Sequence, residues 1–368
     1  MKKSKAKMGQ IDFVLFATIM LLVAIGVVMV YSASSYVSAF KLNDPEFYLK
    51  KQLMWACVGF IFMVTAMKID YHRIKQYTGL IMLITLVLLL AVFAFPPVNG
   101  AKRWIQLGVA NFQPSEIAKY TIVIYMAKSL ELKGEKVKEF FKGIVPYLLV
   151  SGFYAALILQ EPNLSIASVI MIVTVIILFA VGARFFHLFA IGGALVAAVG
   201  VLILIAPYRL ERLMNFRDPF AKSQDEGYQL VQSLLALGSG GVTGAGIGQS
   251  RQKCLYIPEP HTDFIFSIIG EELGLIGGVF IIILFIFFVW RGIKTAVTAK
   301  DIYGTILAIG ITAVVAIQAV INIAVVTGSM PVTGVPLPFI SYGGSALVFN
   351  MFAMGILLNV SRQTANKD

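Results

Sequence analysis

The sequence predicts an all-α, polytopic membrane protein, and two properties of the chain lead to this fold class. Hydrophobic residues make up 58% of the 368 residues and charged residues only 13%, which is far from the balance of a soluble domain. Apolar runs of about 18 residues or more, long enough to cross about 30 Å of hydrocarbon as a helix, recur along the whole chain. We therefore expect about ten transmembrane helices.

The first apolar segment follows Lys2, Lys3, Lys5 and Lys7, as in a signal peptide, but no small-residue cleavage site follows a short apolar core. It is predicted to be a retained helix. The ten expected spans lie near residues 11 to 31, 51 to 67, 78 to 95, 113 to 130, 144 to 159, 164 to 182, 186 to 206, 264 to 290, 304 to 327 and 340 to 360.

An even number of spans places both termini on the same side of the membrane. Most of the Lys and Arg in the short connectors lie in the connectors on that side. The positive-inside rule therefore predicts that both termini are cytoplasmic. The net charge of +11 is explained by this asymmetry and by the attraction of the basic residues to the anionic headgroups of the lipid bilayer. Nucleic acid is therefore not an expected partner. Cys57 and Cys254 suggest no disulfide framework, and the three histidines match no metal-ligand spacing. A metal held by protein ligands alone is not expected.

The connector between the seventh and eighth spans, residues 207–263, is predicted to be a long extracellular loop. Loops of this length are usually functional or disordered, and this one is not low in complexity. Its apolar stretch LVQSLLALGSGG suggests a short interfacial helix ending on glycine. Gly244, Gly246 and Gly248 suggest a tight turn, because the lysine of a phosphate-binding Walker motif is missing.

Five motifs give the chain a specific resemblance. They are NGAKRWIQLG at 99–108, FQPSEIAK at 112–119, GYQLVQSLLALGSGG at 227–241, PEPHTDFIFSIIGEELG at 258–274 and TGVPLPFISYGGSA at 333–346. In this order they resemble the SEDS family, named for shape, elongation, division and sporulation, with FtsW, RodA and SpoVE branches. The wording of the motifs is closer to the FtsW and SpoVE types.

The resemblance implies a single transmembrane domain over residues 1–368 in a bacterial plasma membrane. It implies a peptidoglycan glycosyltransferase that polymerises lipid II with inversion into β-1,4-linked strands, releasing undecaprenyl pyrophosphate, in cell division or spore cortex synthesis. The implied partners are a class B penicillin-binding protein and other divisome or sporulation proteins. No covalently bound cofactor is implied.

Asp263 is the candidate catalytic residue. An inverting displacement needs one general base, and Asp263 stands at the outer end of the eighth span beside an apolar FIF run, whose desolvation should raise its pKa. The family motif offers the same position as catalytic. The alternative is an aspartate that only caps the following helix, since Asp is a favoured N-cap residue.

The departing pyrophosphate needs positive charge. The candidates are Lys102, Arg103, Arg209, Arg212 and Arg217, and Arg103 is the strongest because it belongs to the KRW triplet. These side chains could instead be solvated or paired with lipid phosphate. A divalent cation, Mg or Mn, could bridge the pyrophosphate.

Further polar residues are assigned to the site or its support. His261, Ser341 and Tyr342 are candidates for substrate binding, although the proline-rich segment before Ser341 could be only a rigid re-entrant turn. Glu116 and Lys119, at i and i+3, suggest a buried salt bridge that could line the cavity. Glu271 lies roughly on the face of Asp263 and could orient the site or bond to neighbouring helices. Asn163 departs from the family, which often has an acid there.

Two functions of other classes remain open. A ten-helix protein that handles a lipid-linked sugar could be a flippase for lipid II, but transporters tend to have a midplane site with inverted repeats. The chain shows no convincing similarity between its halves, and its polar groups gather toward the outer face. A catalytically idle scaffold for the crosslinking partner is the other alternative, which an intact Asp263 motif disfavours.

Overall fold

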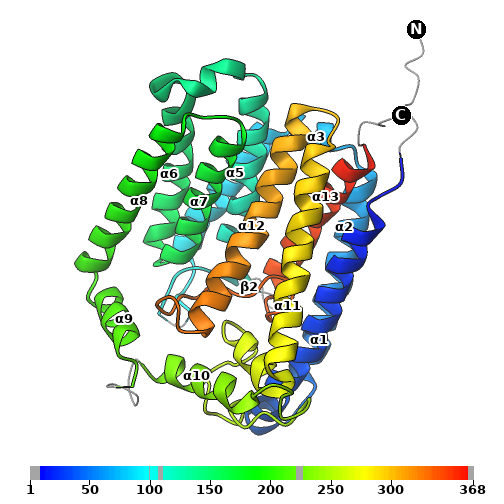
Figure 1. The fold of residues 1–368 in the computed structure, drawn as a ribbon, viewed down its shortest axis with the longest axis vertical. Coiled ribbons are helices and arrows are strands. Elements are labelled where there is room, and N and C mark those ends of the chain that lie inside the picture. The colour runs from blue at the N-terminus through cyan, green and yellow to red at the C-terminus, as the bar shows by residue number, and fades with distance from the viewer. Residues whose placement is uncertain (1–8, 99, 107–110, 221–226, 364–368) are drawn as a thin grey trace.

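A computed structural model of the chain describes residues 9–98, 100–106, 111–220 and 227–363, and the side chains of 207–209 and 215 lie outside this description. The N-terminal lysines and parts of two loops that carry motifs therefore fall outside the described residues. The described part is a bundle of long helices with one small two-stranded ribbon (Figure 1). This arrangement agrees with the predicted all-α fold class.

The elements follow one another along the chain in a simple order. The helices are α1 (Phe13–Leu42), α2 (Phe47–Lys68), α3 (Tyr71–Gln76), α4 (Thr78–Ala91), α5 (Pro114–Glu131), α6 (Val145–Gln160), α7 (Leu164–Ala180), α8 (Phe185–Ile205), α9 (Pro207–Arg217), α10 (Tyr228–Gly240), α11 (Ile265–Val297), α12 (Ile302–Val326) and α13 (Gly344–Arg362). The ribbon pairs β1 (Ile105–Gln106) with β2 (Asn111–Phe112) in antiparallel register.

Each of the ten predicted spans coincides with a helix. Among the described residues, seven helices are long and apolar enough to cross a membrane: α1, α2, α6 with the turn before it, α8, α11, α12 and α13. The segments Thr78–Ala94 and Leu164–Ala180 are shorter apolar helices. The remaining one, α5, carries four charged residues, and two of these, Glu116 and Lys119, are buried. The chain is a multi-pass membrane protein.

The first and last described residues lie at the same end of the bundle. The backbone N–H of Gly9 donates to the carbonyl of Arg362 over 3.1 Å, and Figure 1 shows α1 and α13 meeting at that end. This position is expected for an even number of crossings. Its assignment to the cytoplasm stays a prediction.

The helices differ strongly in how far they enter the core. In their most apolar stretches, α13 is 78% buried and α12 67% buried, whereas α8 is only 11% buried. Glycine permits the close packing at the centre: a Cβ on Gly355 of α13 would lie 2.3 Å from the carbonyl oxygen of Met63 in α2. The peripheral α8 therefore leaves most of its surface to surrounding lipid.

The helix in the predicted span 264–290, α11, is not a single straight helix. Gly274 has φ 65° and ψ −165°, which divides α11 into a first piece, Ile265–Leu273, and a second piece, Leu275–Val297. At about 1.5 Å per residue the second piece alone is long enough to cross about 30 Å of hydrocarbon. The first piece instead packs on α10, where a Cβ on Gly240 would lie 1.9 Å from the carbonyl oxygen of Gly270.

The break at Gly274 is stabilised by the loop that precedes it. A helix break frees backbone donors and acceptors, which must find partners wherever water is scarce. Four such groups bond to residues 241–246: Leu275 N–H to Gly241 O (2.9 Å), Ile276 N–H to Val242 O (3.2 Å), Glu271 O from Ala245 N–H (3.0 Å) and Glu272 O from Gly246 N–H (2.9 Å). The loop and the break therefore depend on each other.

Two predictions for the long loop are confirmed. The apolar stretch LVQSLLALGSGG forms most of α10, which ends at Gly240 and Gly241. Gly244, Gly246 and Gly248 all have positive φ, as a tight turn requires. The N–H of Gly246 bonds to a carbonyl of α11, so it has a partner within the chain.

We predict that Gly274→Ala destabilises the protein by at least about 1–3 kcal/mol, the usual cost of strained backbone. The added Cβ would lie 2.4 Å from the backbone nitrogen of Gly244, and the alanine would have to adopt the positive φ of Gly274. The measurement is the midpoint of thermal unfolding in detergent. The matched control is Gly152→Ala in α6, where an added Cβ meets nothing within 4 Å. Equal midpoints for the two variants would contradict the role of Gly274.

Candidate active site

Several of the sequence motifs converge on one cavity of about 830 Å³. Its walls come from α7, α8 and α12 at one end of the bundle, from α9 and α10, and from four connecting segments. The lining side chains that carry charge are Arg103, Arg212, Glu259 and Asp263. The structure therefore brings the predicted base together with two of the five predicted cations.

Asp263 reaches the cavity from the turn just before α11. The N-cap of α11 is Phe264, and no side chain caps the helix, so the alternative role of Asp263 as an N-cap is not observed. Its carboxylate is partly exposed and lies beside Gly334, where an added Cβ would be 3.4 Å from Asp263 Oδ2. The carboxylate is thus available to a molecule in the cavity.

Three consecutive backbone carbonyls hold the turn that carries Asp263. His261 O accepts from the N–H of Tyr342 (2.8 Å), and Thr262 O accepts from the hydroxyl of Ser341 (2.7 Å). Asp263 O accepts from the side-chain amide of Asn322 in α12 (2.7 Å), which also donates to Val335 O (2.8 Å). The proline-rich segment and α12 therefore fix the backbone on which the carboxylate stands.

Two opposing influences set the pKa of Asp263. Burial has the largest effect and raises the pKa, and the negative charge of Glu259 raises it further. The positive charges of Arg103 and Arg212 lower the pKa, and the result is a value of about 6. A carboxylate with this pKa is mostly ionised at neutral pH and is a stronger base than an ordinary aspartate.

Arg103 is fixed on the turn between α6 and α7. Its Nε donates to Glu161 O over 3.0 Å, and its Nη2 donates to Pro162 O. The carboxylate of Glu161 is fully buried and accepts no hydrogen bond from a described residue. Burial raises the pKa of Glu161 to about 8, while Arg103 lowers it. Asn163, which departs from the family pattern, caps α7 through the N–H of Ile166 (3.2 Å).

The other predicted cations differ in position. Arg212 of α9 lines the cavity, with Nη1 3.5 Å from Val332 O. Lys102 is not on the cavity wall, and its Nζ donates to Phe93 O over 3.1 Å. Arg217 ends α9 as an exposed residue away from the wall, and the side chain of Arg209 is outside the described residues.

His261, Ser341 and Tyr342 do not line the cavity. The His261 ring is buried, with its centroid 4.1 Å from that of Tyr48 and 5.5 Å from that of Tyr342. Burial, with a smaller effect of Lys41, lowers the pKa of His261 to about 4, so the ring is neutral at pH 7. In this structure the three residues support the turn of Asp263 from outside the cavity.

Glu116 and Lys119 form the expected buried pair. Lys119 Nζ donates to Glu116 Oε2 and to Gln318 Oε1 of α12, each over 2.8 Å, and both charged residues are 1% exposed. The pair joins α5 to α12 and does not line the cavity. This geometry matches the salt-bridge interpretation.

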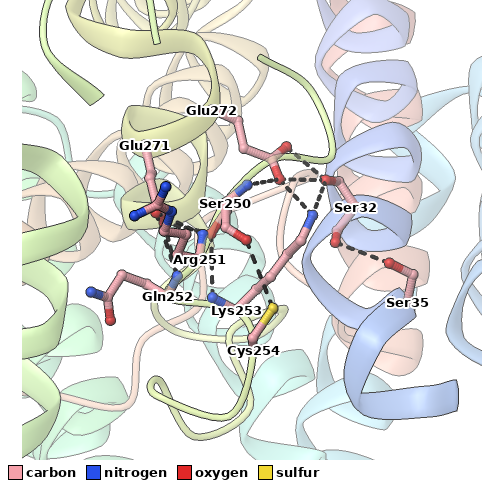
Figure 2. Close-up of polar contacts among 9 residues, drawn as sticks. All are labelled: Ser32, Ser35, Ser250, Arg251, Gln252, Lys253, Cys254, Glu271 and Glu272. Atoms are coloured by element: carbon pink, nitrogen blue, oxygen red, sulfur yellow. Dashed lines mark hydrogen bonds and ion pairs between the residues drawn. The ribbon is translucent and has the colours of Figure 1, made fainter. Parts of the chain in front are cut away.

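Glu271 does not share a face with Asp263. Its carboxylate accepts from the N–H of Arg251 (2.8 Å) and from the hydroxyl of Ser250, as Figure 2 shows. It therefore anchors the long loop and does not line the cavity. Sequence reasoning placed Glu271 by helical spacing and missed Asn322, although an asparagine within an apolar span is itself a signal of an interior role.

The fold and the cavity define a class: a multi-pass α-helical membrane protein with a carboxylate and two arginines in a cavity at one end of the bundle. The model of the FtsW/RodA/SpoVE family, described as cell cycle protein, matches residues 12–366. The chain belongs to this family. Within the described residues, no group of three or more His, Cys, Asp or Glu side chains is placed to hold a metal ion.

Curated relatives match nearly the whole chain. It is 43% identical over 354 residues to the probable peptidoglycan glycosyltransferase FtsW of Geobacter sp. (strain M18), covering 95% of this chain and 96% of that protein. It is 42% identical over 355 residues to stage V sporulation protein E of Bacillus subtilis (strain 168), covering 95% and 97%.

Solved structures resemble the fold at lower identity. A chain from a peptidoglycan synthase complex that coordinates polymerization and crosslinking aligns with a TM-score of 0.79 at 26% identity, covering 97% of this chain and 99% of that one. The rod shape determining protein RodA of Thermus thermophilus aligns with a TM-score of 0.72 at 26% identity, covering 97% and 98%.

Proposed function

We propose that this protein is a peptidoglycan glycosyltransferase that polymerises lipid II in a bacterial plasma membrane. The observation that carries the proposal is the position of Asp263, whose carboxylate enters a cavity with Arg103 and Arg212 while its backbone is held by three hydrogen bonds. The names of the curated relatives support the same activity.

The proposed reaction is a single displacement with inversion. Asp263 takes the proton from the acceptor hydroxyl as that oxygen attacks the anomeric carbon of the donor sugar, and the bond to the lipid pyrophosphate breaks. One base suffices for an inverting displacement, because no covalent glycosyl intermediate forms. A pKa of about 6 leaves Asp263 ionised before the attack and able to accept the proton.

Arg103 and Arg212 are the proposed groups that stabilise the departing pyrophosphate. Arg103 is held by two carbonyls, so it needs little rearrangement when the negative charge develops. A divalent cation, Mg or Mn, is a further part of the proposal. Glu259, the other carboxylate on the wall, would hold it together with phosphate oxygens, which leaves Asp263 as the base, and the cation would supply additional charge for the leaving group.

The cavity position suits a substrate that keeps its lipid tail in the bilayer. Val199 and Ile203 of α8 form part of the wall, and α8 is mostly exposed on its other faces. The sugar and pyrophosphate would therefore occupy the polar cavity while the prenyl chain stays in hydrocarbon. A flippase is the alternative, but the charged groups of the cavity lie toward one end of the bundle and not at its middle, which favours the enzyme.

The remaining proposals concern context. Residues 1–368 would act as one domain with 207–263 as its long outer loop, and both termini would be cytoplasmic. A class B penicillin-binding protein would crosslink the product, alongside other divisome or sporulation proteins. The similarity of this chain to a chain from a peptidoglycan synthase complex supports such a partner. Division or spore cortex synthesis is the proposed setting.

We predict that Asp263→Asn lowers the rate of glycan formation from purified lipid II at least about 100-fold, because the amide keeps the volume but cannot act as a base. The assay uses the protein with its class B partner. The matched control is Asp44→Asn, an aspartate that pairs with Lys50 outside the cavity and should leave the rate unchanged. Near-native rates for Asp263→Asn would refute the base, whereas no polymer from the native protein with its partner bound would call for a test of leaflet translocation.

The rate should also depend on pH in a defined direction. A base must be deprotonated, so kcat/KM should fall about tenfold per pH unit below the pKa of about 6 and level off above it. The measurement is the initial rate of polymerisation between about pH 4.5 and 8. A profile without an inflection on the acidic side would argue against Asp263 as the titrating group.

Arg103→Ala should slow polymerisation on the order of 100-fold through loss of charge at the leaving group. The neighbouring Lys102→Ala is the matched control, since Lys102 lies off the wall of the cavity and should change the rate little. The comparison requires that both variants unfold at the same temperature as the native protein. Equal effects of the two substitutions would move the pyrophosphate site away from Arg103.

A further inference from the structure

A second cavity, of about 930 Å³, lies beside α1 and shares no lining residue with the cavity of Asp263. One wall is the outer part of α1, and the other is the loop 247–256. About 20 residues of a helix cross the hydrocarbon, so α1, which begins at Phe13, emerges near Tyr31 and continues to Leu42. The cavity therefore opens at and above the outer boundary of the membrane.

The floor of this cavity is rigid and electrically balanced. Lys253 Nζ donates to Glu272 Oε1 over 2.8 Å, and the hydroxyl of Ser32 donates to the same carboxylate over 2.6 and 2.7 Å. Figure 2 shows Lys253 extending from the loop toward Glu272 and Ser32. Both charged side chains are buried, so the lysine charge is neutralised within the floor.

Three tyrosines give the walls their chemical character. Tyr31, Tyr36 and Tyr256 line the cavity and are 39%, 46% and 52% exposed. Within the described part of the chain, none of their hydroxyls has a hydrogen-bond partner, and the side-chain amide of the lining residue Gln249 has none either. The walls thus offer flat apolar ring faces beside unused donors and acceptors.

This combination fits one class of ligand. The C–H faces of pyranose rings lie against aromatic rings, and their hydroxyl and N-acetyl groups bond to hydroxyls and amides. With Lys253 neutralised, Arg251 is the one lining cation left, so the cavity lacks the paired arginines that suit a pyrophosphate. Its volume lies in the range of about 300–1,000 Å³ typical of small-molecule sites, enough for a few sugar rings.

We propose that this second cavity binds the uncharged sugar rings of a β-1,4-linked amino-sugar strand. The inference rests on the proposed function, which makes such a strand the product. The same loop joins the two sites: residues 258–263 border the cavity of Asp263, and residues 247–256 border the second cavity. Glu271 and Glu272 anchor the stretch at the second cavity through residues 250–253. A strand that leaves the cavity of Asp263 can then be bound at residues 247–256 of the same loop.

The test measures binding of the soluble hexamer of β-1,4-linked N-acetylglucosamine to the full-length protein by calorimetry in detergent. Asp263→Asn is the background, so binding is scored without polymerisation. Tyr31→Ala and Tyr256→Ala should each raise the Kd about tenfold, since each removes a ring face. Tyr31→Phe and Tyr256→Phe keep the ring and should raise it less.

Two controls locate the ligand. Tyr77→Ala removes an exposed tyrosine that does not line the cavity and should leave the Kd unchanged. Arg103→Ala alters the cavity of Asp263 and should also leave it unchanged. The proposal is overturned if the hexamer does not bind, if Arg103→Ala abolishes binding while the tyrosine variants do not, or if Tyr256→Ala, on an exposed loop, binds as tightly as the background protein. Failure of the proposed function appears separately, as no polymerisation of lipid II by the native protein with its class B partner bound.

Discussion

The structure depends on hydrogen bonds that irregular backbone receives where water is scarce. A membrane protein can depart from helical structure near the bilayer only where the freed N–H and carbonyl groups find other partners. The turn of Asp263 satisfies this requirement with three successive carbonyls, bonded to Tyr342, Ser341 and Asn322. The same bonds that make the turn possible also fix the carboxylate of Asp263, the proposed base, so its placement is a consequence of backbone satisfaction.

The break at Gly274 is subject to the same constraint, because its freed backbone groups also need partners. The backbone of residues 241–246 bonds to the freed groups around the break, and the carboxylates of Glu271 and Glu272 bond to the loop at residues 250–253. Glycine is required there because the two backbones approach more closely than a Cβ permits. Residues 241–253 of the long loop are therefore held to α11 at two places, and the neighbouring residues 247–256 and 258–263 line two cavities.

The sequence allowed prediction of the helices and of the chemistry of Asp263 and Arg103, because hydropathy and local motifs carry that information directly. The position of the break in α11 was not predicted, since GEELGLIGG holds four glycines and only the contact of Gly274 with Gly244 shows which of them interrupts the helix. For the same reason Glu271 was placed by spacing toward Asp263, whereas it bonds to the loop at Arg251. The supporting roles of Ser341 and Asn322 depend on contacts across 79 and 59 positions, which no local pattern encodes.

Electrostatics links the two halves of the proposed reaction. Burial and Glu259 raise the pKa of Asp263, while Arg103 and Arg212 lower it, and the balance leaves this pKa at about 6. A bound pyrophosphate adds negative charge beside the same arginines and offsets their effect on the carboxylate. Its arrival must therefore raise the pKa of Asp263 and make it a stronger base. As the pyrophosphate departs it gains charge, while Asp263 becomes neutral by accepting the proton, so the two changes stabilise each other in the transition state. The arginines thus act on both the leaving group and the base, which is why a single cavity must hold all three residues.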